Sequence, residues 1–331
     1  MSLVGRSGHG DLELRRYEPQ DMGGVVDLLI GSLACPPDLA PALWRWKHEQ
    51  NPFGPAPIWV ATDRDRVVAV RPFLAWEFEH GGRLVRAVRA VDTATHPDYR
   101  GRGLFRTLTE RALADLQAGD VAFVFNTPND QSRPGYLRMG WKTVGRLPVQ
   151  ARFRSVASVA RLARARVPAE LESAASNDDI AAPASRVLSE AARFDAILAS
   201  GRSHAGLATR RTSSYLSWRY GGAPVGYRVL AAPDSPAAVF FRLRQRGTAV
   251  EATVCDVVAP AGRGRVVAGL LRPLARGPAD YAVRLASDGA GRHGYLPVPR
   301  QGPMLVWRGV GGVPMPTLGD WRLCLGDVEL F

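Results

Sequence analysis

The sequence predicts an α/β (α+β) protein made of two similar domains. Each is expected to hold a mixed, mostly antiparallel sheet flanked by helices, and the second is expected to be a degenerate copy of the first. Three observations support this fold class. The chain has 331 residues, about the length of two domains. Strand and helix patterns alternate along the first half, and short motifs of the first half return in the same order in the second.

Residues 1–150 show strand and helix patterns in the order β-α-α-β-β-β-α-β-α-β. Alternating or continuous apolar residues indicate the strands, and apolar residues three and four apart indicate the helices. Polar residues and glycines at 63–66 and 80–82 indicate turns between strands. The predicted strands cover 11–17, three segments within 58–95, 121–126 and 141–147. The predicted helices cover 19–34, a segment from 39 that is stopped by Asn51-Pro52, 104–118 and 130–140.

The composition changes after residue 150. Residues 151–190 are rich in Ala and Arg and predict a helical linker, which is more typical of a solvated connection than of a membrane-binding or RNA-binding helix. Residues 191–331 are then expected to form the second domain.

The composition and the residue spacing argue against several classes of protein. No apolar run approaches the ~20 residues that span a bilayer, and the N-terminus lacks a signal-peptide pattern, so we expect a cytoplasmic protein. Three distant cysteines, Cys35, Cys255 and Cys324, do not suit a disulfide framework. The six histidines show no metal-ligand spacing, so no metal is expected.

The formal net charge is +12, and 41 of the 43 cationic residues are arginine. The planar guanidinium binds phosphate oxygens in pairs, so the bias fits a phosphate-bearing ligand, an anionic substrate or RNA. A GC-rich genome would produce the same bias, and charge alone does not decide between these explanations.

The segment Arg100-Gly101-Arg102-Gly103 separates a predicted strand from a predicted helix. Glycines let the backbone approach an anion, and the first N–H groups of a helix lack partners within the helix. A pyrophosphate would fit this turn, and a tight turn with solvated arginines is the alternative. No GxGxxG motif opens the first strand–helix–strand unit, and no GxxxxGK[ST] motif occurs in the chain.

Two motifs resemble the GNAT acyltransferase superfamily. Its cofactor motif, Arg/Gln-x-x-Gly-x-Gly/Ala, is similar to residues 100–105, with Phe105 in place of the last Gly/Ala. Its second motif, Tyr-x-x-x-Gly-Phe, is similar to residues 136–141, with Trp141 in place of Phe. The resemblance covers about residues 11–150 well and the second half faintly, and the ending DWRLCLGDVELF looks like that of bacterial tandem-GNAT proteins.

The resemblance implies acetyl-CoA or another acyl-CoA as co-substrate. The backbone of Thr93, Ala94 and Thr95 would pair with its pantetheine arm. Asn129 would contact the cofactor, with Asn126 as a competing candidate. The N–H groups of one segment would hold the pyrophosphate, namely those of Arg100, Gly101, Arg102, Gly103, Leu104 and Phe105.

Acyl transfer to an amine needs a group that takes a proton from the amine and one that gives a proton to the leaving thiolate. By the resemblance, Tyr136 would protonate the CoA sulfur and Asp92 would act as the base. The alternatives are a core tyrosine that anchors the last helix and an aspartate with a structural role. His96 is a further candidate base, although a histidine before proline is more often a turn residue.

The second half repeats the first with departures. Ala261 replaces Arg100, and Pro297 would break the short helix, so we expect no CoA binding there. It would instead form a wall of the acceptor cleft or a dimer surface. Trp44, Trp46, Trp218 and Tyr220 would line an acceptor groove or, as is more common, a core. The matched segments are 44–46 with 218–220, Asp92 with Asp256, 101–103 with 262–264, and 135–137 with 294–296.

The sequence therefore predicts an acyl-CoA-dependent N-acyltransferase that transfers an acyl group, acetyl first, to an amine of a small molecule or amino sugar by direct attack. One alternative is an aminoacyl-tRNA-dependent transferase with paired GNAT-like domains, which the charge favours and the intact glycine turn disfavours. Another is a non-catalytic CoA-binding module. We expect a small-molecule amine as partner, no membrane, and a chain that is compatible with a homodimer.

Overall fold

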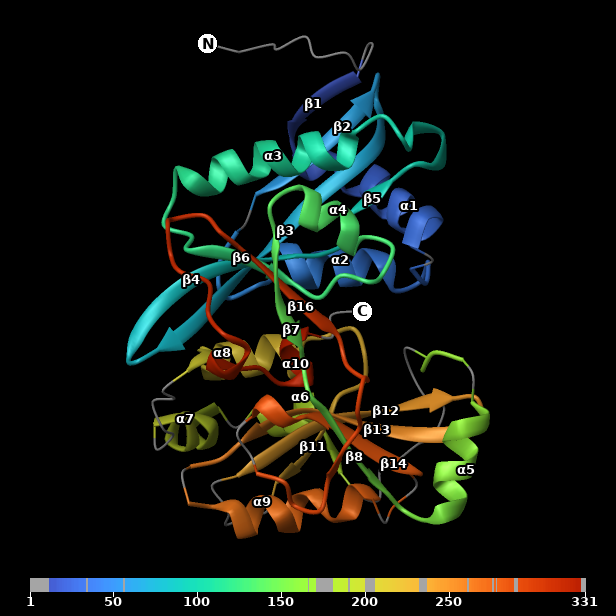
Figure 1. The fold of residues 1–331 in the computed structure, drawn as a ribbon, viewed down its shortest axis with the longest axis vertical. Coiled ribbons are helices and arrows are strands. Elements are labelled where there is room, and N and C mark those ends of the chain that lie inside the picture. Colours follow the sequence, from blue (N-terminus) through green and yellow to red (C-terminus); the bar gives the residue numbers. More distant parts are fainter. Residues whose placement is uncertain are drawn as a thin grey trace.

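The computed structural model contains two separate mixed sheets, one in the upper and one in the lower half of Figure 1. This confirms the predicted fold class. The structure describes residues 12–33, 35–55, 57–165, 167–170, 181–189, 191–199, 206–231, 237–260, 262–275, 277, 279–288 and 291–328.

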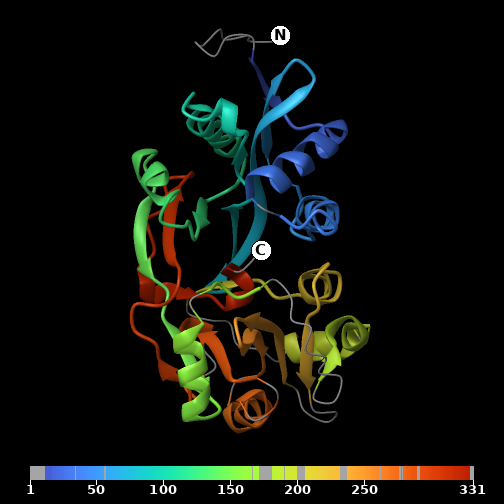
Figure 2. The ribbon, with the colours of Figure 1, turned by 90° about the vertical axis from the view of Figure 1, so that its right-hand side faces the viewer.

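The first sheet has the strand order β1-β2-β3-β4-β6-β16-β7. Helices α1 and α2 cover one face, and α3 and α4 cover the other, as the edge-on view of Figure 2 shows. The short strands β5, β10 and β17 join this sheet outside the main order. Its helices are α1 (Met22–Leu33), α2 (Ala40–His48), α3 (Leu104–Gln117) and α4 (Arg133–Arg138). Its strands are β1 (Leu12–Arg16), β2 (Ile58–Asp63), β3 (Arg66–His80), β4 (Arg83–Ala90), β5 (Ala94–Thr95), β6 (Phe123–Asn126), β7 (Lys142–Arg146), β10 (Leu207–Thr209), β16 (Met304–Gly309) and β17 (Trp321–Arg322).

The second sheet has the strand order β15-β8-β14-β13-β12-β11-β9. Helix α9 packs on one face of it, below the sheet in Figure 1. Its strands are β8 (Val149–Phe153), β9 (Ala182–Pro183), β11 (Arg228–Ala231), β12 (Ala238–Arg246), β13 (Ala249–Val258), β14 (Tyr281–Leu285) and β15 (Leu296–Pro297). The helices of this half are α5 (Val156–Arg164), α6 (Ala184–Leu188), α7 (Ala191–Ala199), α8 (Ser213–Leu216), a π-helical turn Ser217–Gly221, α9 (Gly264–Leu271) and α10 (Leu325–Val328).

The first sheet contains β10, β16 and β17 from the C-terminal half, and the second contains β8, which begins at Val149 at the end of the first half. Strand β16 comes from the C-terminal half and lies between β6 and β7 of the first sheet. Strand β8 continues directly from the first half and lies between β14 and β15 of the second. Strand pairing therefore crosses the predicted boundary at residue 150, and the division of the chain into domains at that residue stays a prediction.

Where the two halves of the chain meet, two tryptophans, one from each half, are related by an approximate two-fold arrangement. Trp46 Nε1 donates to the carbonyl oxygen of Trp218, and Trp218 Nε1 donates to that of Trp46, both at 2.7 Å. Their rings stack with centroids 5.2 Å apart. This reciprocal pair equates Trp46 with Trp218. The predicted match of Trp44 with Trp218 is therefore wrong by two residues, because Trp-x-Trp and Trp-Arg-Tyr look alike in either alignment.

One apolar cluster continues through both halves. It includes Trp46 and Phe78 from the first half with Tyr215, Phe240 and Trp321 from the second. The four aromatic residues predicted as either groove or core are all buried, with exposed fractions of 7% or less, so the groove interpretation is wrong. The interface is thus a shared core, in which rigid motion of one half against the other would break packing.

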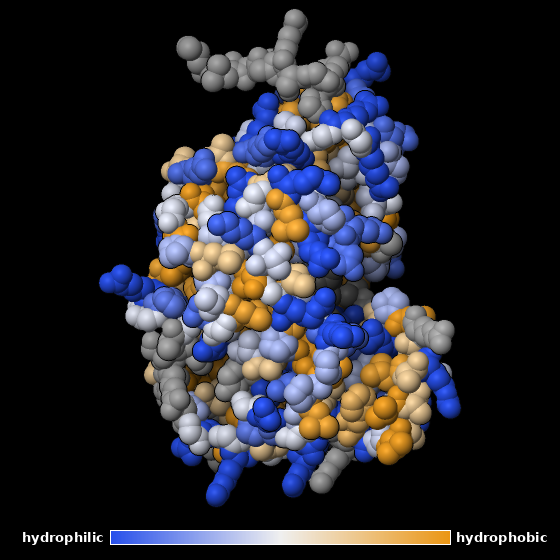
Figure 3. Space-filling view, in the orientation of Figure 1, coloured by the Kyte–Doolittle hydropathy of each residue, from blue (hydrophilic) through white to orange (hydrophobic). Residues whose placement is uncertain are grey.

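The visible surface in Figure 3 is mainly polar, with apolar residues gathered at the lower right, where Figure 1 places α5. Val156 of α5 is 87% exposed. Among the described residues, no helix is long and apolar enough to cross a membrane.

Because β16 fills a place between two strands of the first sheet, the fragment 1–148 alone should not fold. We expect it to show no cooperative urea unfolding transition by circular dichroism, and co-expression with fragment 149–331 should restore one. A 149–331 fragment carrying Val306→Pro should not restore it, because proline removes a ladder N–H from a central strand. Cooperative unfolding of 1–148 by itself would contradict this prediction.

Candidate functional site

The candidate site begins where the first sheet divides. Strand β4 pairs with β6 in parallel as far as Arg89 and Phe125. The backbone then turns at Asp92, which has a φ of 45°, a left-handed conformation that aspartate tolerates better than most residues. The chain resumes as β5, which pairs only with β3. Strands β5 and β6 therefore part, and one edge of β5 is left beside the gap.

The backbone of Thr95 points toward this edge. The N–H of His96 donates to the carbonyl of Val68 at 2.8 Å, and Ala94 pairs with Val70 across the ladder. Because backbone groups of successive strand residues point to opposite sides, those of Thr93 and Thr95 point away from β3. This is the geometry that an extended ligand needs to pair with an exposed strand edge.

The glycine turn lies at the N-terminus of α3. Gly101 and Gly103 have φ values of 76° and 77°, and Gly103 is the N-cap residue with no side-chain cap. A side chain at either position would strain the backbone. Around Gly101, no atom lies within 4 Å of where a Cβ would stand. The uncapped N–H groups and the open space fit a phosphate group.

The two arginines of the turn are exposed and point their side chains along it. Arg100 Nε donates to the carbonyl of Thr95 at 3.3 Å, and Arg102 donates to that of Asp98 at 3.1 Å. The guanidinium of Arg102 also lies 4.7 Å from the ring centre of Tyr99. Leu104 is buried and anchors the start of α3 in the core.

Phe105 does not lie over the turn but packs inward. Its ring contacts Tyr136 edge to face at 5.4 Å. A Cβ on Gly135 would lie 3.0 Å from the Phe105 ring, so the glycine before Tyr136 makes room for it. The departure from the family motif therefore changes the packing between α3 and α4.

Tyr136 and Thr93 are brought together by a residue that the sequence analysis missed. Arg71 of β3 donates from Nη1 to the phenol oxygen of Tyr136 at 2.9 Å and to Thr93 Oγ1 at 2.5 Å. Tyr136 is 4% exposed. A single arginine within the apolar run of β3 was the signal that could have identified Arg71.

Asp92 is held in a buried ionic cluster. Lys47 Nζ lies 2.8 Å from its Oδ1, and His48 Nε2 lies 3.2 Å from its Oδ2. Burial alone would raise the pKa of Asp92, but Lys47 and His48 outweigh it and lower the pKa to about 2. Burial lowers the pKa of His48, so its ring is neutral near pH 7.

The same arrangement recurs in the second half. Asp256 accepts from Arg211 Nε at 2.8 Å and from the phenol of Tyr220 at 3.2 Å. With Trp46 equated to Trp218, His48 corresponds to Tyr220. Both aspartates thus bind the helix or turn that carries the interface tryptophan, and this suits an anchoring role. The role of Asp92 as general base stays a prediction.

The two asparagine candidates differ in their surroundings. The side-chain oxygen Oδ1 of Asn129 accepts from the N–H and hydroxyl of Ser132, so it holds the turn before α4. Asn126 is 3% exposed at the end of β6, and its Oδ1 has no hydrogen-bond partner among the described residues. A buried oxygen without a partner favours Asn126 over Asn129 for contact with a ligand.

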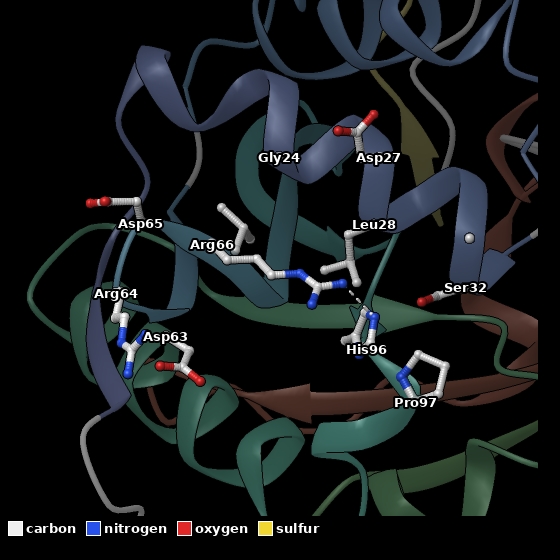
Figure 4. Close-up of a pocket in the computed structure, with 12 residues that line it drawn as sticks. Gly24, Asp27, Leu28, Ser32, Asp63, Arg64, Asp65, Arg66, His96 and Pro97 are labelled. Carbon is white, nitrogen blue, oxygen red and sulfur yellow. Dashed lines mark hydrogen bonds between the residues drawn. The ribbon is translucent and has the colours of Figure 1, made fainter.

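A hollow of about 750 Å³ lies on the other side of this chain segment (Figure 4). It is bounded by α1, the β2–β3 turn and residues 96–97. His96 faces it and lies 2.7 Å from Arg66 through Nε2. Neither Tyr136 nor Asp92 lines this hollow, so the structure separates His96 from the other predicted catalytic residues.

In the second half, residue 261 lies outside the described residues, so the replacement of Arg100 there is not described. Pro297 lies in β15 rather than in a helix. Among the described residues, no cluster of three or more metal-ligating side chains is found.

Comparison with known proteins agrees with this geometry. Residues 13–144 match the family described as the acetyltransferase (GNAT) domain. A search among curated proteins finds no match for the chain. Residues 13–144 are therefore similar to the GNAT family of acyltransferases, a family that typically uses acyl-CoA.

Solved structures share the fold over most of the chain. A GCN5-related N-acetyltransferase from Anabaena variabilis aligns with a TM-score of 0.59 and 13% identity, covering 91% of this chain and 73% of that one. Eis1 from Mycobacterium abscessus aligns with a TM-score of 0.55 and 16% identity, covering 90% and 73%. A putative acetyltransferase from Pyrococcus horikoshii aligns with a TM-score of 0.53 and 12% identity, covering 97% and 95%. At these identities the likeness establishes the fold alone.

We expect Asp92→Asn to lower the free energy of unfolding by about 3 kcal/mol at pH 7, because Lys47 then loses its buried counter-charge. In the unsubstituted protein the low pKa of Asp92 adds stability above its usual pKa, and this is lost as the pH falls from about 5 to 2. The loss should be about 2 kcal/mol.

Urea unfolding at several pH values measures both effects. The exposed Asp98 provides the matched control, and Asp98→Asn should change little. An Asp92→Asn protein with unchanged stability at pH 7 would show that the cluster does not anchor α2.

Proposed function

We propose that this protein is an acyl-CoA-dependent N-acyltransferase that transfers an acyl group, acetyl first, to an amine of a small molecule or an amino sugar. The main observation behind this proposal is the left-handed glycine turn at the start of α3. The turn follows β5, whose edge away from β3 is exposed. It lies on the face of the sheet that also carries α4, the helix of Tyr136. The GNAT match over residues 13–144 supports the same assignment.

In this proposal the backbone of Thr93 and Thr95 orients the pantetheine arm, and the first N–H groups of α3 hold the pyrophosphate. Arg100 and Arg102 add positive charge at the solvent side of the turn. A bound acyl-CoA would supply an activated thioester carbonyl. Asn126, with its buried unpartnered oxygen, is added to the cofactor contacts, and Asn129 is kept as the residue that shapes the loop before α4.

Tyr136 is proposed to protonate the leaving sulfur. Its phenol oxygen already accepts from Arg71, so the phenol hydrogen is directed elsewhere and can be donated. Asp92 stays ionised at neutral pH because of its low pKa and orients His48 through a hydrogen bond, while burial keeps that ring neutral. Proton removal from the amine is assigned to Asp92 as predicted, with His48 as the neighbouring group that could take the proton instead.

The proposed pyrophosphate site at the start of α3 is tested by isothermal titration with acetyl-CoA. We expect micromolar binding that weakens at least tenfold in an Arg100→Ala/Arg102→Ala double variant and at higher salt, because charge-assisted hydrogen bonds to phosphate are lost. Arg83→Ala, on the exposed far end of β4, should leave the affinity unchanged. No binding of any acyl-CoA would overturn the proposal, and tRNA would be the next ligand to titrate.

The chemical role of Tyr136 is tested with the same protein. Tyr136→Phe should lower kcat by about 10²- to 10³-fold on any amine that the unsubstituted protein acetylates, with acetyl-CoA affinity changed less than threefold. The free-thiol product measures turnover. An unchanged kcat would show that Tyr136 only anchors α4.

A further inference from the structure

Arg71 is a buried, positively charged side chain that has no carboxylate beside it among the described residues. It lies in the middle of β3 with an exposed fraction of 0%. Its Nε and Nη2 have no hydrogen-bond partner among the described residues, and no described carboxylate lies within 4.0 Å of it. Burial of an unpaired charge is costly, so such a group usually marks a place where negative charge arrives from outside the chain.

The two hydrogen bonds that Arg71 makes both end at the candidate site. Nη1 donates to Thr93, whose backbone faces the open edge of β5, and to Tyr136, the proposed proton donor. A phenol oxygen that accepts from a guanidinium has its own hydrogen left to donate. Arg71 thus fixes both the position of the phenol and the direction in which it acts.

Aromatic rings hold the guanidinium in place of a carboxylate. Its central carbon lies 4.6 Å from the ring centre of Phe73 and 5.3 Å from those of Phe105 and Tyr136. Ring faces attract a cation without cancelling its charge, as a carboxylate would. Phe105, the departure from the family motif, therefore forms one wall of this cage.

The second half of the chain has an apolar residue at the position that matches Arg71. Asp256 pairs with Phe240 across the β12–β13 ladder. In the first sheet β3 passes from β4 to β5, and the β5 register, Val70 with Ala94, sets Arg71 against Thr93, one residue beyond Asp92. One residue beyond Asp256 is Val257, which pairs with the apolar Val239. The copy that is expected not to bind CoA thus has an apolar residue where the first has Arg71, although the aspartate is kept.

We infer that Arg71 is a positioning residue for the leaving-group step, and this inference rests on the proposed function. The nitrogen of the acceptor amine bonds to the carbonyl carbon of the thioester. As the carbon–sulfur bond breaks, its electron pair passes to sulfur and Tyr136 transfers its proton there. The negative charge left on the phenol oxygen is stabilised by the N–H of Arg71. The proton released by the acceptor amine then returns to the phenol.

The test compares CoA with desulfo-CoA by isothermal titration, so it needs no knowledge of the acceptor. The unsubstituted protein should bind CoA about tenfold more tightly than desulfo-CoA, because Tyr136 donates to the sulfur. Arg71→Met and Tyr136→Phe should each remove most of this preference. The double variant should lose no more than either single variant, because both changes break one interaction.

Methionine suits the cage, since an apolar side chain replaces a buried charge at little cost in stability, and thermal unfolding verifies that the variant is folded. Arg111→Met is the matched control, because Arg111 also lies over an aromatic ring, that of Trp59, at 5.4 Å but away from Tyr136. It should keep the full preference. Arg71→Lys should restore part of it.

A folded Arg71→Met protein with the full preference for CoA would overturn the role of Arg71 and leave the proposed function standing. So would losses that multiply in the double variant, or an unsubstituted protein that binds CoA and desulfo-CoA equally. An unsubstituted protein that binds neither would overturn the proposed function itself, and the role of Arg71 with it.

Discussion

The exchange of β8 and β16 is the constraint on which the rest of this structure depends. Each sheet is completed by a strand from the other half, and the apolar cluster continues through both. Neither sheet can be closed without the other half of the chain. The paired tryptophans, the buried aspartates and the site between β5 and β6 all lie within this jointly built unit.

The candidate site depends on that unit at close range. Strand β16 pairs with β6 through Asn126, and Val306 of β16 packs in the cluster that contains Tyr136. At the end of β4, Arg89 donates to the carbonyls of Asp327 and Val328 in α10. The C-terminal half therefore supports the strand ends that define the site.

Much of the first sheet could be predicted because its signals are local. Helical spacing predicted α1 and α3, an aromatic segment predicted α2, and the glycines at 101 and 103 predicted the tight turn before α3. The contacts that could not be predicted are long-range. The exchange of β16, the Arg71–Tyr136 bond and the Lys47–Asp92 pair join residues far apart in sequence, and no local pattern encodes such pairings. The tryptophan repeat was recognised but aligned wrongly, since only the reciprocal hydrogen bonds fix its register.

Two separate copies of one such half that exchanged this strand would form a domain-swapped dimer, in which both members must stay alike. When the two halves are joined in one chain, they still exchange strands, but their sequences can differ. The second half can carry the apolar Val239 at the position that matches Arg71 and still supply β16, because a strand contributes by its backbone and its packing rather than by reactive side chains. The interlocked strands thus allow the two halves to differ at the candidate site while each still completes the sheet of the other.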